Sequence, residues 1–92
     1  MMPKGMKFKI CGKVQGVGFR YHTAYFALSI GLTGYAKNLV EGDVEVVAFG
    51  TDTQLVQMAE FLVKGPRGSR VDGVVKEEIV DTAKRYNGFN IL

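Results

Sequence analysis

Apolar and polar side chains alternate near the start of the chain, in residues 6 to 13 (MKFKICGK). One side of an extended chain would carry Met6, Phe8 and Ile10, and the other side would carry Lys7, Lys9, Cys11 and Lys13. Because successive side chains of a strand point to opposite faces of a sheet, this alternation predicts a half-buried β-strand.

A helical spacing begins after a glycine-rich stretch. Apolar residues recur every three or four positions, at Tyr21, Ala24, Tyr25, Leu28 and Leu32. This period predicts an amphipathic helix whose apolar stripe faces the core. We expect Gly31 or Gly34 to end the helix.

The next segment, residues 34 to 50 (GYAKNLVEGDVEVVAFG), reads as two strands around a turn at residues 40 to 43. Gly42 supplies the permissive backbone that such a turn needs. The sequence therefore predicts a β-hairpin directly after the first helix.

A second helix has clear signals at both ends. Thr51 and Gln54 form the pattern of a capping box, in which two side chains satisfy free main-chain N–H groups at a helix start. The apolar stripe that follows consists of Leu55, Met58, Ala59 and Leu62. Gly65 and Pro66 form a stop signal.

Two more strands complete the order βαββαβ with an extra strand, one in residues 70 to 80 (RVDGVVKEEIV) and one in residues 88 to 92 (GFNIL). Two helices cannot cover both faces of such a sheet. We therefore expect an α+β domain with a mostly antiparallel sheet, both helices on one face and the lysines on the open face. A chain of 92 residues has room for one core, so residues 1–92 are expected to form a single domain.

Composition narrows the function classes. The chain is 47% hydrophobic and 23% charged, which indicates a compact globule rather than a disordered chain. No apolar run approaches the roughly 20 residues that span a bilayer. The N-terminus MMPKGMKFKI lacks the apolar core of a signal peptide, so we expect a cytoplasmic protein that binds no membrane. Cys11 is the one cysteine and has no partner at ligand spacing, which argues against a metal site.

The net charge of +3 is unevenly distributed, because residues 1 to 40 contain six Lys or Arg and no Asp or Glu. This bias has two interpretations. Either an anion binds in this part of the chain, or the lysines solvate an exposed sheet face.

The glycine-rich stretch between the first strand and the first helix is the main candidate for chemistry. It fails the Walker pattern, because Val17 stands where a glycine is needed, and it lacks the third glycine of a dinucleotide fingerprint. Glycines before a helix N-terminus can turn several main-chain N–H groups toward one oxyanion. Arg20 would add a guanidinium fork that matches two oxygens of a phosphate or carboxylate. A tight turn with a solvated arginine is the alternative.

Asn38, near the end of a predicted strand, is the second candidate. Its amide can both donate to and accept from a water molecule, so it could orient an attacking nucleophile, although Asn near a turn commonly caps its own backbone. His22 could modulate a site next to Arg20, or it could be a solvated surface residue. No Ser-His-Asp or Cys-His set can be assembled from the single histidine and Cys11.

Two motifs together resemble those of the acylphosphatase family. Residues 12 to 20 (GKVQGVGFR) look like its first signature. Residues 34 to 50 are similar to the second, with Gly42, Val44 and Gly50 at the expected separations. The length, the order of elements and the Gly-Pro turn after the second helix also fit that family. The resemblance implies its ferredoxin-like fold.

The resemblance also implies an activity. Arg20 would be the catalytic arginine that binds phosphate, and Asn38 would position the hydrolytic water. The substrate-binding loop, which would act through main-chain N–H groups, consists of Gln15, Gly16, Val17, Gly18 and Phe19. The family hydrolyses acyl phosphates to a carboxylate and inorganic phosphate without a metal, a cofactor or a covalent enzyme intermediate. A small-molecule acyl phosphate is therefore the implied substrate.

Other functions stay open on the sequence alone. RNA-recognition domains share the βαββαβ order, but the strand VEVVAFG lacks the paired aromatics on which bases stack. A phosphate-sensing or assembly domain without catalysis would keep the same anion pocket. A metal carrier of this fold would need a C-x-x-C pair, which is missing. We expect a free-standing monomeric enzyme that binds no nucleic acid.

Overall fold

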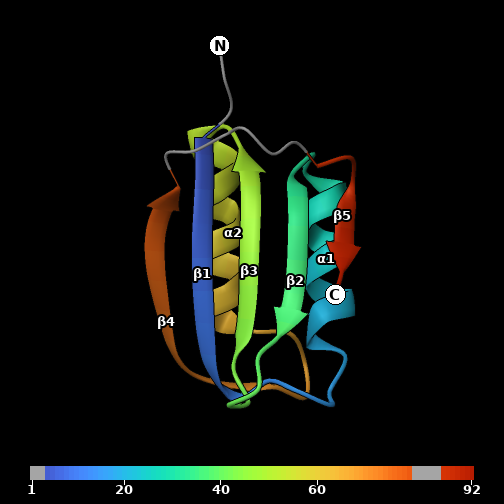
Figure 1. The fold of residues 1–92 in the computed structure, drawn as a ribbon, viewed down its shortest axis with the longest axis vertical. Coiled ribbons are helices and arrows are strands. Elements are labelled where there is room, and N and C mark those ends of the chain that lie inside the picture. The colour runs from blue at the N-terminus through green and yellow to red at the C-terminus, as the bar shows by residue number, and fades with distance from the viewer. Residues whose placement is uncertain (1–3, 80–85) are drawn as a thin grey trace.

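In the part of the chain that the structure describes, five strands form one sheet and two helices cover one of its faces (Figure 1). The computed structural model describes residues 4–79 and 86–92. The elements are β1 (Lys4–Lys13), α1 (Phe19–Ser29), β2 (Thr33–Asn38), β3 (Val44–Gly50), α2 (Asp52–Lys64), β4 (Arg70–Ile79) and β5 (Phe89–Ile91). The predicted order and the placement of both helices on one face are confirmed. Residue 80, the last of one predicted strand, lies outside the described residues.

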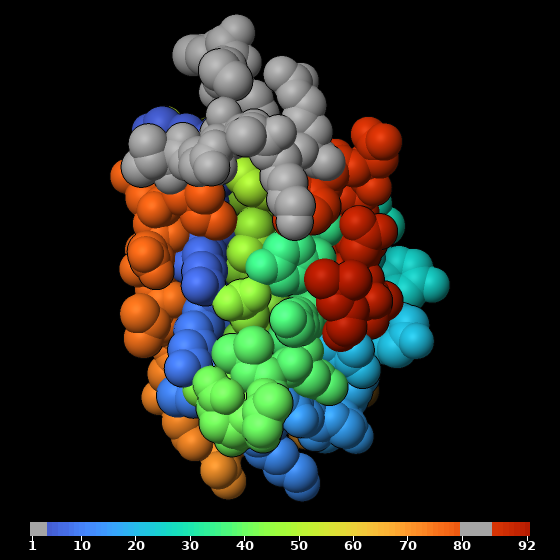
Figure 2. Space-filling model, in the orientation of Figure 1, coloured from blue at the N-terminus to red at the C-terminus, as the bar shows by residue number. Residues whose placement is uncertain are grey.

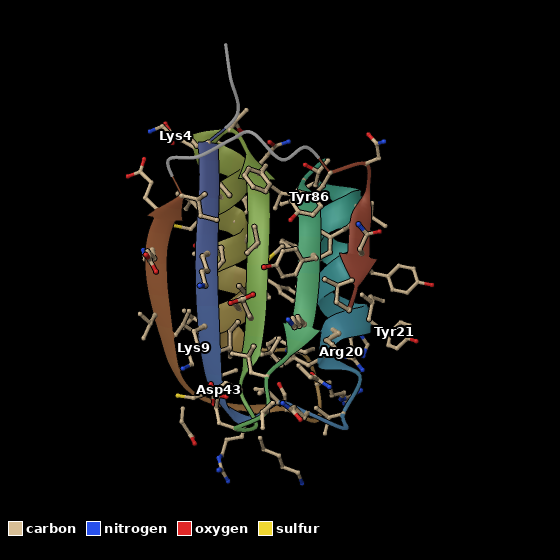
Figure 3. The ribbon with its side chains drawn as sticks, viewed as in Figure 1. Lys4, Lys9, Arg20, Tyr21, Asp43 and Tyr86 are labelled. Carbon is tan, nitrogen blue, oxygen red and sulfur yellow. The ribbon has the colours of Figure 1, made fainter. Side chains whose placement is uncertain are left out.

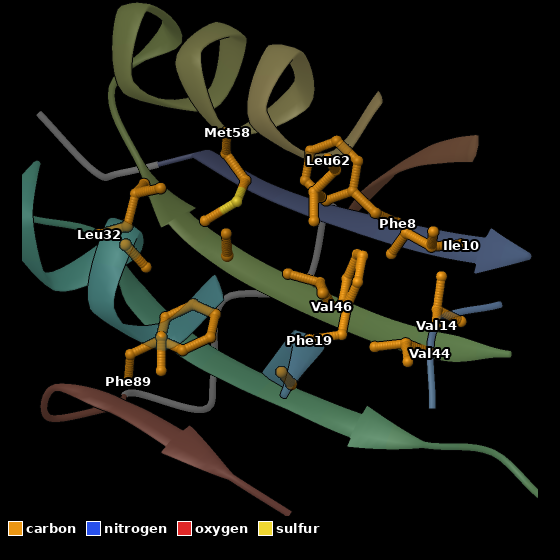
Figure 4. Close-up of a cluster of buried hydrophobic side chains, with 14 of the residues drawn as sticks. Phe8, Ile10, Val14, Phe19, Leu32, Val44, Val46, Met58, Leu62 and Phe89 are labelled. Atoms are coloured by element: carbon orange, nitrogen blue, oxygen red, sulfur yellow. The ribbon is translucent and has the colours of Figure 1, made fainter. Parts of the chain in front are cut away.

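The strands lie in the order β4-β1-β3-β2-β5. Neighbours are antiparallel except for β2 and β5, which run parallel. Strand β1 therefore lies inside the sheet, and its alternation has the predicted meaning: Phe8 pairs with Val46, Ile10 pairs with Val44, and all four are fully buried. These four side chains lie in the core between the sheet and the helices, together with side chains from α1, α2 and β5 (Figure 4).

Helix α1 packs with a different face from the one that we predicted. Tyr21, Tyr25 and Leu28 are 59%, 75% and 53% exposed, so the prediction that they belong to a core-facing stripe is wrong. The buried residues of the helix are Phe19, Thr23, Ala24 and Ala27. Small residues at a contact allow a helix to approach its neighbour closely. The two alanines therefore face the sheet, and the large side chains of this stripe point outward.

Helix α2 begins and ends as predicted. The Thr51 hydroxyl accepts a hydrogen bond from the Gln54 main-chain N–H at 3.2 Å, and the Gln54 side-chain oxygen accepts one from the Thr51 N–H at 2.8 Å. Gly65, with φ of 74°, follows the last turn. The Gln54 amide also donates to the main-chain oxygen of Ile30 at 2.7 Å, which ties the start of α2 to the end of α1.

The hairpin between β2 and β3 closes through main-chain hydrogen bonds. The Leu39 N–H donates to the Asp43 oxygen at 2.8 Å, and the Gly42 N–H donates to the Leu39 oxygen at 3.1 Å. Gly42 has φ of 104°, a conformation that favours glycine. The predicted turn at residues 40 to 43 is confirmed, and it places Asn38 at the base of the turn.

The open face of the sheet carries lysines, as expected, but two of them, Lys7 and Lys9, are paired with carboxylates. Lys7 lies 3.4 Å from Glu45, and Lys9 lies 3.2 Å from Glu41 and 3.7 Å from Asp43. Figure 3 shows Lys9 and Asp43 at the same end of the sheet. The hydrogen bond to Glu41 raises the pKa of Lys9 above its ordinary value. These two lysines therefore do not form a free anion-binding surface.

No helix in the described ranges is long and apolar enough to cross a membrane. An apolar groove of about 700 Å³ lies between α2 and the edge strand β4, lined by residues such as Leu55, Val63 and Val74. None of the predicted site residues lines it.

Candidate active site

The loop between β1 and α1 is held at both ends by buried side chains. Val14 and Phe19 are each 1% exposed and belong to the core, which fixes the short segment between them. Gly16 and Gly18 have φ of 74° and 75°. A Cβ at Gly16 would meet no atom within 4 Å. Its glycine is therefore required by the left-handed backbone rather than by lack of space.

The earlier glycine of the motif has another role. A Cβ at Gly12 would lie 2.1 Å from the main-chain oxygen of Arg70. Gly12 also lies where the register between β1 and β4 shifts. This glycine therefore permits the close approach of two strands and lies outside the loop.

Main-chain N–H groups in the loop are free to bind a ligand. Within residues 4–79 and 86–92, residues 15 to 18 donate no main-chain hydrogen bond. Gly18 occupies the N-cap position before helix α1 and offers no side-chain cap, and the first turn of the helix contains no acidic residue. The first N–H groups of a helix carry partial positive charge, so this end of α1 attracts an anion.

Arg20 adds a full positive charge in the same first turn. A cation at a helix N-terminus is electrostatically unfavourable, so its presence there suits a site that receives an anion. Its Nη1 donates to the main-chain oxygen of Leu92 at 2.7 Å, and the Leu92 N–H donates to the oxygen of Ala36 at 2.8 Å. This chain of contacts holds the guanidinium beside β2, and it uses one of five donors. Figure 3 shows Arg20 near the end of β2.

Asn38 is the last residue of β2, two positions beyond the fully buried Ala36. It therefore shares the sheet face that the helices cover. Its side-chain oxygen is buried and has no hydrogen-bond partner among the described residues. The main chain closes the adjacent turn, so the alternative in which this oxygen caps its own backbone does not hold. A buried acceptor without a partner is costly, and it marks a place where a bound molecule would be held.

Sequence reasoning missed the side chain of Gln15. Its Nε2 donates to the main-chain oxygens of Leu39 at 2.8 Å and Asp43 at 2.9 Å. The glycine loop is thereby bonded directly to the turn after Asn38, and Figure 2 shows the two segments side by side at one end of the molecule. The partners lie 24 and 28 residues away in the sequence, so no local pattern could have indicated the contact.

The remaining candidates lie apart from this arrangement or at its rim. The exposed His22 ring lies against Gly18, since its Nε2 would be 3.7 Å from a Cβ at that glycine. Cys11 is exposed on the open face of the sheet, and its Sγ lies 3.5 Å from the oxygen of Gly73. In the described part of the chain, no group of three or more His, Cys, Asp or Glu side chains could hold a metal ion.

The family model for acylphosphatase matches residues 6–91. The chain belongs to the acylphosphatase family. It is 49% identical over 92 residues to an acylphosphatase of Vibrio parahaemolyticus, with all of both chains covered. It is also 51% identical to an acylphosphatase of Vibrio vulnificus over 86 residues, which cover 94% of this chain and 93% of the relative.

Solved structures agree with this result. The fold is similar to that of an acylphosphatase from Coxiella burnetii, with a TM-score of 0.91 and 37% identity. That comparison covers 99% of this chain and 94% of the other. The family and ferredoxin-like fold implied by the sequence motifs are therefore confirmed. The chain is a hydrolase of the acylphosphatase type, and membership of this family implies hydrolysis of acyl phosphates.

Proposed function

We propose that the chain hydrolyses acyl phosphates with Arg20 and the loop amides as the phosphate-binding groups and Asn38 as the group that orients water. The observation that carries this proposal is that the loop before the uncapped N-terminus of α1 is hydrogen-bonded to the turn that directly follows Asn38. Free loop amides and Arg20 lie at that helix end, and the Asn38 oxygen without a partner lies at the end of β2. Gln15 bonds the two segments together.

Binding of the phosphoryl group follows from charge and geometry. Its oxygens accept hydrogen bonds from the main-chain N–H groups of residues 15 to 19, and the free donors of Arg20 bind a further pair. These hydrogen bonds to the phosphoryl oxygens become stronger as the bond to the acyl oxygen breaks and the charge distribution changes. Removing one such donor typically costs about 10²- to 10³-fold in rate.

The chemical step needs little else from the protein. Asn38 holds a water molecule, and the water oxygen forms a bond to phosphorus while the bond from phosphorus to the acyl oxygen breaks. The electron pair of that bond leaves with the carboxylate, which is a weak base and needs no general acid. The water proton passes to an oxygen of the phosphoryl group. Phosphoryl transfer relies mainly on positioning and charge stabilisation, which explains a site without a protein base.

Hydrolysis of benzoyl phosphate in the presence of EDTA tests the proposal. The native chain is compared with Arg20→Ala and Asn38→Ala, and inorganic phosphate binding is measured for all three by titration calorimetry. We expect turnover that survives EDTA, Arg20→Ala to lose phosphate binding, and Asn38→Ala to bind phosphate but barely turn over. Near-normal turnover by folded Asn38→Ala would remove that residue from the mechanism.

A folded native chain that binds phosphate without turnover would favour the phosphate-sensing alternative. Metal independence, the monomeric state, the cytoplasmic location and the lack of a nucleic-acid partner stay predictions from the sequence. Each can be measured on the same purified protein or in cells, independently of the residue roles.

A further inference from the structure

We propose that the side chain of Gln15 is a positioning residue, which fixes the phosphate-binding loop against the strand end that carries Asn38. The inference rests on the proposed function and adds a role that the loop motif does not reveal. In the mechanism above, position 15 takes part through its main-chain N–H. The side chain has a separate task, because it points away from the loop and toward the β2–β3 turn.

The contact uses both donors of one amide group. The Nε2 lies 2.8 Å from the Leu39 oxygen and 2.9 Å from the Asp43 oxygen, and a glutamine side chain has two N–H groups to give. The same two oxygens also accept the main-chain bonds that close the hairpin turn. Gln15 therefore bonds to a closed turn rather than to a loose loop, and the turn begins directly after Asn38.

No other hydrogen bond joins the two halves of the site directly in the described part of the chain, since the contact of Arg20 reaches β2 only through Leu92. The loop amides come from the β1–α1 connection and Arg20 from the first turn of α1, whereas Asn38 comes from β2. Attack on phosphorus needs the water on Asn38 to lie in line with the breaking bond. A shift of one segment by about 1 Å can cost on the order of 10²-fold in rate.

This arrangement predicts a split between binding and turnover. The groups that bind phosphate all lie on one continuous segment, the β1–α1 loop and the first turn of α1, so they remain together when the link is removed. The position of Asn38 relative to the phosphoryl group is what the link sets. Loss of the link should therefore lower kcat and leave the affinity for inorganic phosphate nearly unchanged.

The central experiment compares Gln15→Met with the native chain. Methionine has similar length and flexibility but lacks the two donors. We expect kcat for benzoyl phosphate to fall by about 10- to 100-fold, with less than a threefold change in the phosphate dissociation constant. Gln54→Met is the matched control, because Gln54 also bonds main-chain groups far apart in the sequence but lies at the start of α2. It should lower the stability and keep the native kcat at a temperature where it is folded.

A double variant separates a positioning role from a general loss of structure. If Gln15 acts through Asn38, the variant with both Gln15→Met and Asn38→Ala should turn over no more slowly than Asn38→Ala alone. If instead the fold-losses in kcat of the two single variants multiply in the double variant, the inference is overturned. Gln15→Glu adds a pH profile, since its carboxyl group can donate one bond only when protonated. Its kcat relative to the native chain should therefore rise as the pH falls toward 4.

The native protein supplies a measurement that requires no variant to fold. Both side-chain amide protons of Gln15 should exchange with solvent more slowly than those of the exposed Gln57, as measured by NMR. Equal exchange rates would overturn the inference. The inference would also be overturned if the native chain is active and folded Gln15→Met has the same kcat. In that case the proposed function stands. A native chain without turnover refutes the proposed function, and the inference fails with it.

Discussion

Arg20 in the first helix is bonded to the main-chain oxygen of Leu92 at 2.7 Å, although the two residues lie 72 positions apart. Leu92 is in turn fixed to β2, because its N–H donates to Ala36. A long arginine side chain otherwise samples many rotamers in water. The contact therefore orients the guanidinium beside β2 before any anion arrives, and among the described residues its other donors have no partner.

Ending the chain at Ile91 should weaken phosphate binding, because Arg20 must then lose its own rotamer freedom when it binds. Ordering such a side chain costs about 0.5–1.5 kcal/mol, which corresponds to an increase of roughly 2- to 12-fold in the phosphate dissociation constant. Titration calorimetry with inorganic phosphate measures the change. Leu92→Ala is the control, since it keeps the main-chain oxygen and should bind like the native chain. Unchanged affinity in the shortened chain would show that the contact does not orient Arg20.

Most of the fold could be predicted because its signals are local. The alternation in β1, the capping box of Thr51 and Gln54 and the turn at Gly42 each depend on a few neighbouring residues. The buried face of helix α1 could not be predicted from such local signals. Two stripes run along it at helical spacing, and hydrophobicity favoured the one that contains Tyr25, which is 75% exposed. Which stripe faces the sheet depends on how closely the helix packs, and a single sequence does not reveal that distance.

The candidate site also combines residues that local motifs predict with contacts that only the folded chain creates. Arg20, Asn38 and the loop were predicted from the two family motifs, together with the chemistry of anion binding, and their roles stay predictions. The hydrogen bonds of Gln15 and Leu92 were missed, because each joins segments that only the folded sheet brings together. The charge bias at the start of the chain had two interpretations, and for Lys7 and Lys9 the ion pairs with carboxylates from beyond residue 40 favour the solvated sheet face.

Gly16→Ala should damage the site as well as the fold. Gly16 has φ of 74°, so an alanine at this position would have to adopt the left-handed conformation, which costs about 1–2 kcal/mol of stability. Gly68 is the matched control, because its φ is 89° and a Cβ there also meets nothing within 4 Å. Both variants should lose similar stability in urea. Only Gly16→Ala should weaken phosphate binding, by up to about tenfold for 1.4 kcal/mol of strain. Equal phosphate affinity in both would argue against the loop as the binding site.

Thr23→Val should stabilise the protein. Thr23 is fully buried in α1, and its hydroxyl has no hydrogen-bond partner among the described residues. Burial of an unpaired polar group costs about 1–3 kcal/mol, and valine removes that group while keeping the shape. We expect the free energy of unfolding in urea to rise by about 1 kcal/mol. Thr23→Ser keeps the hydroxyl and removes the methyl group, so it should be less stable than the native chain. A less stable Thr23→Val would show that the hydroxyl is paired in solution.

Tyr35 should make stability depend on pH in the alkaline range. Burial raises the pKa of its phenol well above the ordinary value of 10.0, and the hydrogen bond that it donates to the Glu45 carboxylate at 2.7 Å raises the pKa further. Above pH 10 the unfolded chain loses this proton while the folded chain keeps it. The unfolded state then binds fewer protons, so the free energy of unfolding falls as the pH rises.

The contribution of Tyr35 is therefore complete below pH 10 and is lost progressively above it. Urea unfolding between pH 8 and pH 11 measures the slope. Lys4 and Lys9, whose pKa values are also raised by carboxylate partners, contribute with the same sign. Tyr35→Phe should therefore reduce the alkaline loss without abolishing it. Identical slopes for Tyr35→Phe and the native chain would contradict the raised pKa.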